Sequence, residues 1–396
     1  MTRAYGLPYQ GSKNGIVKFI IDNIPSGKDK ILVDLFGGGG AVTHYAMEQD
    51  KYADYILNDI QPGLTDFFME CVNGEHTIDK HTKWISREDF FKYKDYDWYI
   101  KLCWSFSNNG CGYMYSEEVE PWKKMLWMSR VIGDFSLFED IEINTDGSSK
   151  DIKENKEEYK DKYIRWYLKN IIKTDNDYIL QKQEVEEGIR KESEQLREYL
   201  VNALKLSGLK QSEVNKYLGT QMSKHYFAKS QWQFPTREHY EKMQKIMPEL
   251  NKDYDDILYL YKLMHTLRTL QNLGRLQSLE SLERLQRLQI LQELKNKKDK
   301  LITLCQSYET VIIPDNAIIY CDIPYNNTEC GCYCGFNYDK FYDWAEQQKN
   351  IYISEYTMPE DRFISIAEIK KPVLSSGQGT LKNKATEKIW VPRTNI

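Results

Sequence analysis

The sequence of 396 residues has no long apolar run. A helix that crosses a bilayer needs about 18 or more consecutive apolar residues, so we do not expect an integral membrane protein. The first ten residues contain no apolar segment behind a basic start, and we therefore expect no secretory signal. With 41% hydrophobic and 29% charged residues, the composition favours a soluble globular protein.

Cysteine and histidine are too scattered to indicate a disulfide framework or a hydrolase. The eight cysteines are better explained as reduced intracellular thiols in a chain of this length. Cys330, Cys332 and Cys334 cluster, but a structural zinc site needs a fourth ligand, and no matching Cys or His pair stands out. None of the six histidines lies in H-E-x-x-H or beside a Ser or Cys elbow. We expect no metal.

The overall charge does not identify a partner. The chain holds 54 Lys and Arg against 59 Asp and Glu, a formal net charge of −5. A nucleic-acid-binding face needs only local basicity, so this balance neither suggests nor excludes DNA.

Both ends of the chain have the pattern of an α/β domain. Residues 30–36 and 55–60 are short apolar runs typical of buried strands, and a helix is predicted between them over residues 41–50. Three further strands are predicted near the end of the chain, over residues 317–321, 351–354 and 372–375.

The middle of the chain is different. Residues 151–206 are rich in Glu and Lys, which predicts mainly solvated helix, and residues 145–150 form the best linker candidate. We therefore predict a doubly wound α/β core of residues 1–95 and 300–396. A mainly helical insertion over residues 96–299 interrupts this core.

Residues 207–245 resemble a helix-turn-helix of the phage-repressor type. The first helix is predicted over Gln211–Leu218 and the reading helix over Gln221–Lys229. The segment holds seven Lys or Arg against three Glu, a charge that favours DNA phosphates. The alternative is an ordinary helical hairpin with a solvated basic face.

A leucine-rich tract covers residues 267–294, with a leucine at every third position. This period slips by about 60° per step against an α-helix, so the tract is not one coiled-coil seam. The composition favours helix, around which the leucines would wind. We interpret the tract as low complexity and assign it no function.

A glycine-rich turn follows the first predicted strand, in the segment Asp34-Leu-Phe-Gly-Gly-Gly-Gly-Ala41. It lacks the G-x-G-x-x-G/A pattern of dinucleotide sites and the G-x-x-x-x-G-K-[ST] pattern of nucleotide loops. It fits the F-x-G-x-G turn of S-adenosylmethionine enzymes. Asp59 ends the next predicted strand, where a carboxylate can accept hydrogen bonds from ribose hydroxyls. The alternative for Asp59 is a surface carboxylate at a strand end.

The segment Asp322-Ile-Pro-Tyr325 follows the predicted strand 317–321 and suits chemistry on the amino group of a base. The carboxylate of Asp322 and the carbonyl of Ile323 can each accept an amine N–H, which directs the nitrogen lone pair at an electrophilic methyl. Pro324 biases Ile323 toward extended backbone, and Tyr325 can stack on an extruded ring. The alternative is a plain loop that leaves a strand.

Together these motifs resemble a DNA adenine-specific methyltransferase of the Dam-like class in the α arrangement, similar to phage relatives. Tyr9-Gln-Gly-Ser-Lys13 resembles the opening motif of the family, the glycine turn its methionine loop, and Asn58-Asp59 its ribose-binding acid. Ser354-Glu-Tyr-Thr-Met-Pro359 and Leu374-Ser-Ser-Gly377 look like segments after the catalytic motif. The resemblance covers residues 1–115 and 305–396. It departs from the family in reading D-I-P-Y where D-P-P-Y is usual.

The resemblance implies S-adenosylmethionine as methyl donor, adenine in duplex DNA as acceptor, and a Rossmann-like methyltransferase core. The implied catalytic residues are Asp322, Ile323, Pro324 and Tyr325. The implied cofactor contacts are Tyr9, Lys13, Asp34, Phe36, Gly37, Gly38, Gly39, Asp59 and Asp322. The loop Ser105–Tyr113 looks like the start of a recognition region, so the predicted DNA contacts are Asn108, Asn109, Lys210, Lys224 and Lys229.

Two alternatives stay open at this point. The first is methylation of the N4 amine of cytosine, by enzymes that more often carry Ser at the position of Asp322. The second is a DNA-binding regulator that keeps the fold without catalysis. We expect a monomer in the cytoplasm of a bacterial cell, encoded by the bacterium, a phage or a prophage, and associated with restriction-modification.

Overall fold

The computed structural model describes residues 3–173, 182–229, 232–271, 276–325, 335–372 and 384–395. The chain divides into two compact units. The first joins Met1–Met114 to Leu279–Ile396, and the second is Tyr115–Ser278. The predicted insertion, residues 96–299, is longer than this second unit, because helices at both of its ends pack with the first unit.

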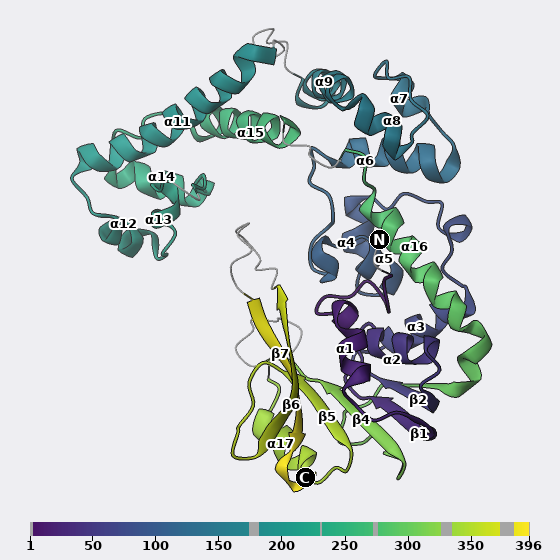
Figure 1. The fold of residues 1–396 in the computed structure, drawn as a ribbon. Coiled ribbons are helices and arrows are strands. Elements are labelled where there is room, and N and C mark those ends of the chain that lie inside the picture. Colours follow the sequence, from purple (N-terminus) through teal and green to yellow (C-terminus); the bar gives the residue numbers. More distant parts are fainter. Residues whose placement is uncertain are drawn as a thin grey trace. The chain divides into compact units, whose positions relative to one another are not determined.

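The first unit is built on a seven-stranded sheet in the order β3-β2-β1-β4-β5-β7-β6 (Figure 1). The strands are β1 Gly27–Asp34, β2 Tyr52–Asn58, β3 Leu301–Leu304, β4 Ala317–Asp322, β5 Ile351–Glu355, β6 Phe363–Pro372 and β7 Lys384–Pro392. The pairs among β3, β2, β1, β4 and β5 are parallel. β7 pairs antiparallel with both β5 and β6.

The strands predicted over 30–36, 55–60, 317–321 and 351–354 correspond to β1, β2, β4 and β5. The strand predicted over 372–375 lies outside the described residues except for Pro372, which ends β6. The patterns did not predict β3, β6 or β7. β6 and β7 mix polar and apolar residues along their length. This mixture is a weaker sequence signal for a strand than the continuous apolar runs of buried parallel strands.

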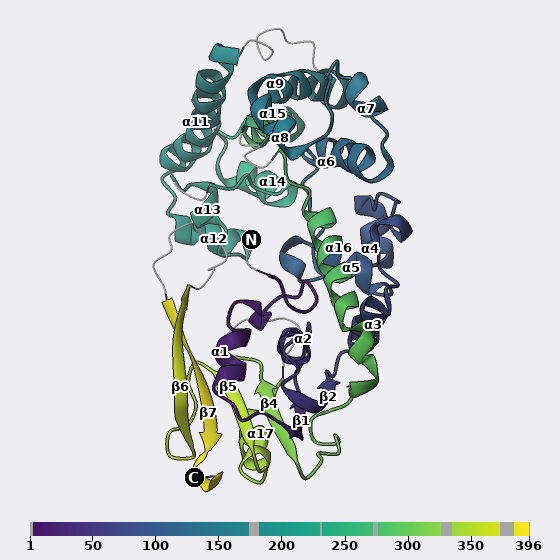
Figure 2. The ribbon, with the colours of Figure 1, turned by 45° about the vertical axis from the view of Figure 1, so that its right-hand side comes forward.

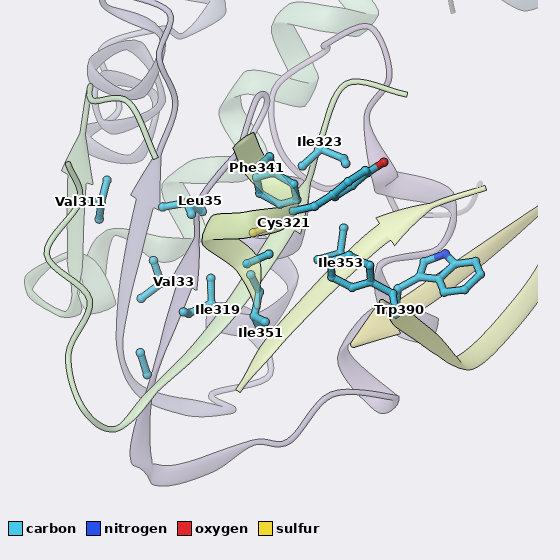
Figure 3. Close-up of a cluster of buried hydrophobic side chains, with 14 of the residues drawn as sticks. Val33, Leu35, Val311, Ile319, Cys321, Ile323, Phe341, Ile351, Ile353 and Trp390 are labelled. Atoms are coloured by element: carbon cyan, nitrogen blue, oxygen red, sulfur yellow. The ribbon is translucent and has the colours of Figure 1, made fainter. Parts of the chain in front are cut away.

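Helices cover both faces of the sheet. On one face, Val33, Ile319 and Ile353 pack with Phe341 of α17 in a buried cluster (Figure 3). Side chains alternate along a strand, so Leu32 points to the opposite face, on the side of α2 and α3. The fold is therefore the predicted doubly wound, Rossmann-like α/β core.

The helices of the first unit are α1 Val17–Asp22, α2 Ala41–Glu48, α3 Leu64–Asn73, α4 Arg87–Tyr93, α5 Trp98–Cys103, α16 Glu280–Ile290 and α17 Tyr338–Ala345. Its 3₁₀ turns are η1 Lys13–Gly15, η2 Ile78–Lys80, η3 Phe106–Asn108, η6 Leu291–Lys300 and η7 Arg393–Asn395. Among the described helices of the whole chain, none combines the length and apolarity that a membrane crossing requires.

The second unit is helical (Figure 2). Its helices are α6 Glu120–Trp127, α7 Ser136–Glu139, α8 Ser149–Glu154, α9 Lys156–Tyr167, α11 Lys182–Ser207, α12 Gln211–Leu218, α13 Ser223–Tyr226, α14 Arg237–Ile246 and α15 Tyr254–Gln271, with π-helical turns η4 Met128–Ile132 and η5 Leu168–Ile172.

The linker predicted over residues 145–150 is wrong, because that segment lies inside the second unit. Its Ser148 caps α8 by accepting a hydrogen bond from the Asp151 N–H at 3.1 Å. The Glu/Lys-rich stretch after it is helical where it is described. It is not uniformly solvated, because Tyr159, Tyr163 and Tyr167 of α9 form a buried stripe.

The first helix of the predicted helix-turn-helix is confirmed as α12, but the reading helix over Gln221–Lys229 is wrong. α13 covers only Ser223–Tyr226. The chain turns back on it: the Gln233 N–H donates to the His225 carbonyl at 3.1 Å and the Trp232 indole to the Tyr226 carbonyl at 2.8 Å. These donors take the carbonyls that a longer helix would use.

The leucine-rich tract is not one continuous helix. It begins in the last turns of α15 and resumes in α16 and η6, while residues 272–275 lie outside the described chain. Within α16 the slip extends over Leu282, Leu285 and Leu288 and reaches only about 120°. In the 3₁₀ segment η6, three residues make one turn, so leucines spaced by three share a face.

The expectation that the leucines wind around a helix is therefore wrong for the described part. Leu282 is half-buried. The others that are described are buried: Leu267, Leu270, Leu276, Leu279, Leu285, Leu288, Leu291 and Leu294.

Two arginines of the same tract fasten loops of the first unit. Arg284 donates to the Ser105 carbonyl at 2.6 Å and the Leu102 carbonyl at 3.1 Å. Arg287 donates from Nε to the Gly6 carbonyl at 3.0 Å and from Nη2 to the Tyr5 carbonyl at 2.7 Å. Burial lowers the pKa of Arg287 to about 10, which still leaves it charged at neutral pH. The tract thus holds the N-terminal segment in place.

Replacing Arg287 should destabilise the first unit. Arg287→Ala leaves two carbonyls without charged donors, and we expect a loss of about 2–4 kcal/mol in unfolding free energy. Thermal denaturation monitored by circular dichroism measures the effect. Gln286→Ala is the control, because Gln286 is the exposed neighbour on α16. Equal midpoints for the two variants would contradict the role given to Arg287.

Candidate active site

A cavity of about 380 Å³ opens at the carboxyl ends of β1 and β4. β1 is followed in the sheet by β2 and β3 on one side, and β4 is followed by β5 on the other side. Ligands of open α/β sheets bind at such a switch point, and the volume lies in the roughly 300–1,000 Å³ range of small-molecule sites. All the residues predicted as catalytic or cofactor-binding line it: Tyr9, Lys13, Asp34, Phe36, Gly37, Gly38, Gly39, Asp59, Asp322, Ile323, Pro324 and Tyr325.

The glycine turn forms one wall of the cavity. Gly38 and Gly40 have φ angles of 51° and 66°, which glycine adopts without the cost that other residues have. A Cβ on Gly39 would lie 2.7 Å from the Cβ of Tyr9, so the opening motif packs closely against the turn. Position 39 therefore needs glycine to avoid a clash with Tyr9, whether or not a ligand is bound.

Asp59 joins the turn to the end of β2. One carboxylate oxygen accepts the Gly38 N–H at 2.8 Å and the other accepts the Gln61 N–H at 2.9 Å. Burial raises the pKa of Asp59, and these two hydrogen bonds oppose the rise. The side chain is therefore held in one orientation at the cavity wall, where the sequence predicts a ribose contact.

Asp34 lies at the end of β1 and is almost fully buried. It accepts hydrogen bonds from Thr43 of α2, from the hydroxyl at 2.8 Å and from the backbone N–H at 3.3 Å. Burial raises the pKa of this carboxyl to about 7, against the effect of the Thr43 hydrogen bonds. Asp34 therefore fixes the start of α2 behind the glycine turn.

Lys13 contacts the D-I-P-Y segment. Its ammonium lies 2.5 Å from Oδ1 of Asp322, a contact between residues 309 positions apart. The Lys13 side chain is only 5% exposed, so the charge is buried and needs this partner. The sequence predicts Lys13 as a cofactor contact, and the structure adds that it holds the carboxylate of Asp322.

The D-I-P-Y segment is held at three further points. The side chain of Ile323 is buried in the cluster that includes Phe341 (Figure 3). The Pro324 carbonyl accepts a hydrogen bond from the Tyr338 hydroxyl at 3.0 Å. The ring of Tyr325 has the Lys13 ammonium 4.5 Å from its centroid. The isoleucine that replaces the usual proline therefore contributes to the core.

The sequence did not predict Glu387 and Tyr356. The Tyr356 ring lies 4.5 Å from that of Tyr325, between centroids, and lines the cavity. Tyr356 lies within the segment 354–359, which the resemblance singled out without giving it a role. Glu387 accepts a hydrogen bond from the Tyr325 hydroxyl. It belongs to β7, a strand without a sequence signal, so nothing in the chain near it pointed to the site.

None of the predicted DNA contacts is among the residues that line this cavity. Asn108 uses its amide to donate to the Pro8 carbonyl at 2.9 Å, and Asn109 accepts the Cys111 N–H at 2.8 Å. Asn108 therefore ties its loop to the N-terminal segment, Asn109 shapes its own loop, and DNA contact by either stays a prediction. Lys210, Lys224 and Lys229 belong to the second unit and are exposed.

No metal centre is evident in the described part of the chain. Within it, no group of three or more His, Cys, Asp or Glu side chains could hold a metal ion. Cys330, Cys332 and Cys334, which the sequence singled out, lie outside the described residues, as does the segment Leu374–Gly377.

Replacing Asp34 should change how stability depends on pH. Because the folded carboxyl has a raised pKa, its ionisation opposes folding as the pH rises from about 4 to about 7. Asp34→Asn removes this cost and keeps an acceptor for Thr43. The difference in melting temperature between variant and wild type should shift in favour of the variant between pH 4 and pH 8. The control is Asp29→Asn on the same strand, whose side chain is 76% exposed. A difference that does not vary with pH would contradict the burial of an ionisable Asp34.

Comparison with known proteins supports the resemblance drawn from the motifs. The sequence model of the D12 class N6 adenine-specific DNA methyltransferase family matches residues 9–109. This stretch contains Tyr9, Lys13, the glycine turn and Asp59, and ends before the D-I-P-Y segment. A search of curated proteins finds no match. Over this stretch the chain is similar to the D12 class of N6 adenine-specific DNA methyltransferases.

Proposed function

We propose that the enzyme transfers a methyl group from S-adenosylmethionine to the N6 amine of adenine in duplex DNA. The observation that carries this proposal is the single cavity at the switch point. The opening motif and glycine turn line it from one end of the chain, and Asp322–Tyr325 from the other. Donor and acceptor need adjoining sites, because methyl transfer requires the two reacting atoms to be in close contact.

The residues of the cavity suit the donor. S-adenosylmethionine, when bound, supplies the electrophilic methyl group on a cationic sulfur. Three carboxylates line the cavity, Asp34, Asp59 and Asp322, together with the aromatic rings of Tyr9 and Phe36. Carboxylates favour a nearby cation and accept hydrogen bonds from hydroxyl groups. Asp59 would hold the ribose, and the backbone of the glycine turn would line the amino-acid part.

Asp322 and Ile323 would orient the amine. Oδ1 of Asp322 accepts from Lys13, and we assign the other oxygen, Oδ2, to one N–H of adenine. The Ile323 carbonyl would accept the second N–H, so that the lone pair points toward the methyl carbon. In this arrangement the amine nitrogen would bond to the methyl carbon as its bond to sulfur breaks, and the amine would then lose one proton to water. The aligned acceptors stabilise the positive charge that develops on the nitrogen.

The target base must leave the duplex to reach the cavity, at a cost of a few kcal/mol. Tyr325 would stack on the extruded ring. The exposed lysines Lys210, Lys224 and Lys229 of the second unit would contact phosphates, which hold the duplex without reading its sequence.

Incubation of the enzyme with unmethylated DNA and S-adenosylmethionine carrying a labelled methyl group tests the reaction. Label recovered on N6 of adenine is the expected result. Label on N4 of cytosine would replace the proposal with the first alternative from the sequence. DNA binding without transfer would replace it with the second.

Asp322→Asn should reduce methyl transfer by at least about 10²-fold, the loss typical of removing one aligned electrostatic group. The amide keeps the shape of the side chain, and thermal denaturation shows whether the fold survives. Asp315→Asn is the matched control, since Asp315 is exposed immediately before β4. Retained transfer in the Asp322 variant would remove this residue from its role.

Replacing Lys210, Lys224 and Lys229 together by Ala should weaken DNA binding and reduce its salt dependence. Each lost phosphate contact lowers the slope of log K against log salt by about 1. The control replaces Lys150, Lys153 and Lys191, three exposed lysines of the same unit. Fluorescence anisotropy with a labelled duplex at several salt concentrations measures both slopes. Equal slopes for the two triple variants would contradict the assignment.

A further inference from the structure

Glu387 is a buried carboxylate that no sequence motif of the site includes. It lies on β7, opposite Ile369 of β6, and its side chain is fully buried. Burial of an ionised carboxylate is costly unless specific partners compensate for it. A glutamate at such a position therefore needs an explanation in terms of its contacts.

Two groups of the site face this carboxylate. The Tyr325 hydroxyl donates a hydrogen bond to its Oε1 atom. The Lys13 ammonium lies 3.8 Å from the same oxygen. Burial raises the pKa of the Tyr325 hydroxyl, and the nearby carboxylates of Asp322 and Glu387 raise it further. The phenol therefore keeps its proton and acts as the donor.

The hydrogen bond to Glu387 fixes the position of the Tyr325 hydroxyl. Tyr325 follows Pro324 at the end of the D-I-P-Y segment, and the torsion that turns an aromatic ring has a broad, two-fold minimum. The ammonium of Lys13 lies over the ring and Tyr356 lies beside it. The hydrogen bond to Glu387 holds the hydroxyl end of the side chain, and a charged acceptor makes it stronger than a neutral one.

We propose that Glu387 is a positioning residue that fixes the ring of Tyr325 for stacking on the extruded adenine. This inference rests on the proposed function, in which Tyr325 stacks on the base. Glu387 acts through Tyr325 and does not touch the substrate itself. The antiparallel strand β7 thereby contributes to a site whose other parts come from the parallel strands and their loops.

The test compares Glu387→Ala and Glu387→Gln in two backgrounds, wild type and Tyr325→Phe. Methyl transfer to unmethylated genomic DNA at saturating DNA and S-adenosylmethionine gives kcat. Glu387→Ala should lower kcat by about 10- to 100-fold, the loss expected when a reacting group is misplaced by about 1 Å. Glu387→Gln keeps an acceptor for the hydroxyl and should recover most of the rate. In the Tyr325→Phe background, which lacks the hydroxyl, Glu387→Ala should cost less than about threefold, because residues that act as a unit are non-additive.

Two measurements separate positioning from a general structural effect. Equilibrium dialysis with labelled S-adenosylmethionine should give the same Kd for wild type and both Glu387 variants within about threefold, a change of under 1 kcal/mol. Thermal denaturation identifies a variant that fails to fold, and Glu387→Gln then carries the test. Glu368→Ala is the matched control, since Glu368 is exposed on the neighbouring strand β6.

The outcomes distinguish this inference from the proposed function. If the wild-type enzyme places no methyl group on adenine, the proposed function fails before any variant is compared. If it does, an unchanged kcat in a folded Glu387→Ala enzyme overturns the role of Glu387. Equal losses in the two backgrounds overturn it as well, because Glu387 would then act without the hydroxyl of Tyr325.

Discussion

The parallel pairing of β1 with β4 is the constraint on which the site depends. It sets Asp34 beside Tyr320, so the loops that follow the two strands open at the same edge of the sheet. The chain between these strands includes the whole helical unit. This is tolerable because the entropy of closing a loop grows only with the logarithm of its length, by about 0.6 kcal/mol per doubling. A long insertion therefore leaves the core intact, and the two ends of the chain share one cavity.

Within that cavity, buried charges organise the D-I-P-Y segment. Lys13 reaches Asp322 from the opening motif, and Glu387 reaches Tyr325 from β7. Each of these groups would be expensive to bury alone, and their mutual contacts offset part of that cost. The same contacts that offset the desolvation cost also hold the carboxylate and the aromatic ring in place. Stability and the geometry of the site are therefore coupled through a few polar contacts.

In the leucine-rich tract, the local secondary structure determines which leucines of the repeat are buried. Its period of three does not match an α-helix, yet nearly all of its described leucines are buried, because breaks and a 3₁₀ segment reset the phase. The residues between the leucines include Arg284 and Arg287, which bind backbone carbonyls next to the opening motif and the asparagine loop. The repeat thus supports the site indirectly, although it carries no chemistry of its own.

The sequence by itself determined the α/β core, most of its parallel strands, and the residues of both walls of the cavity. Continuous apolar runs and glycine turns are local signals, and Asp34, Asp59 and Asp322 stand directly beside them. The boundaries of the helical unit, the short α13 and the strands β6 and β7 depended on contacts between distant segments. Only tertiary structure decided that Lys13 meets Asp322 and that Glu387 meets Tyr325. Such pairs leave no pattern along the chain, because a side-chain contact depends on distance in space and the register of strands, and spacing in the sequence encodes neither.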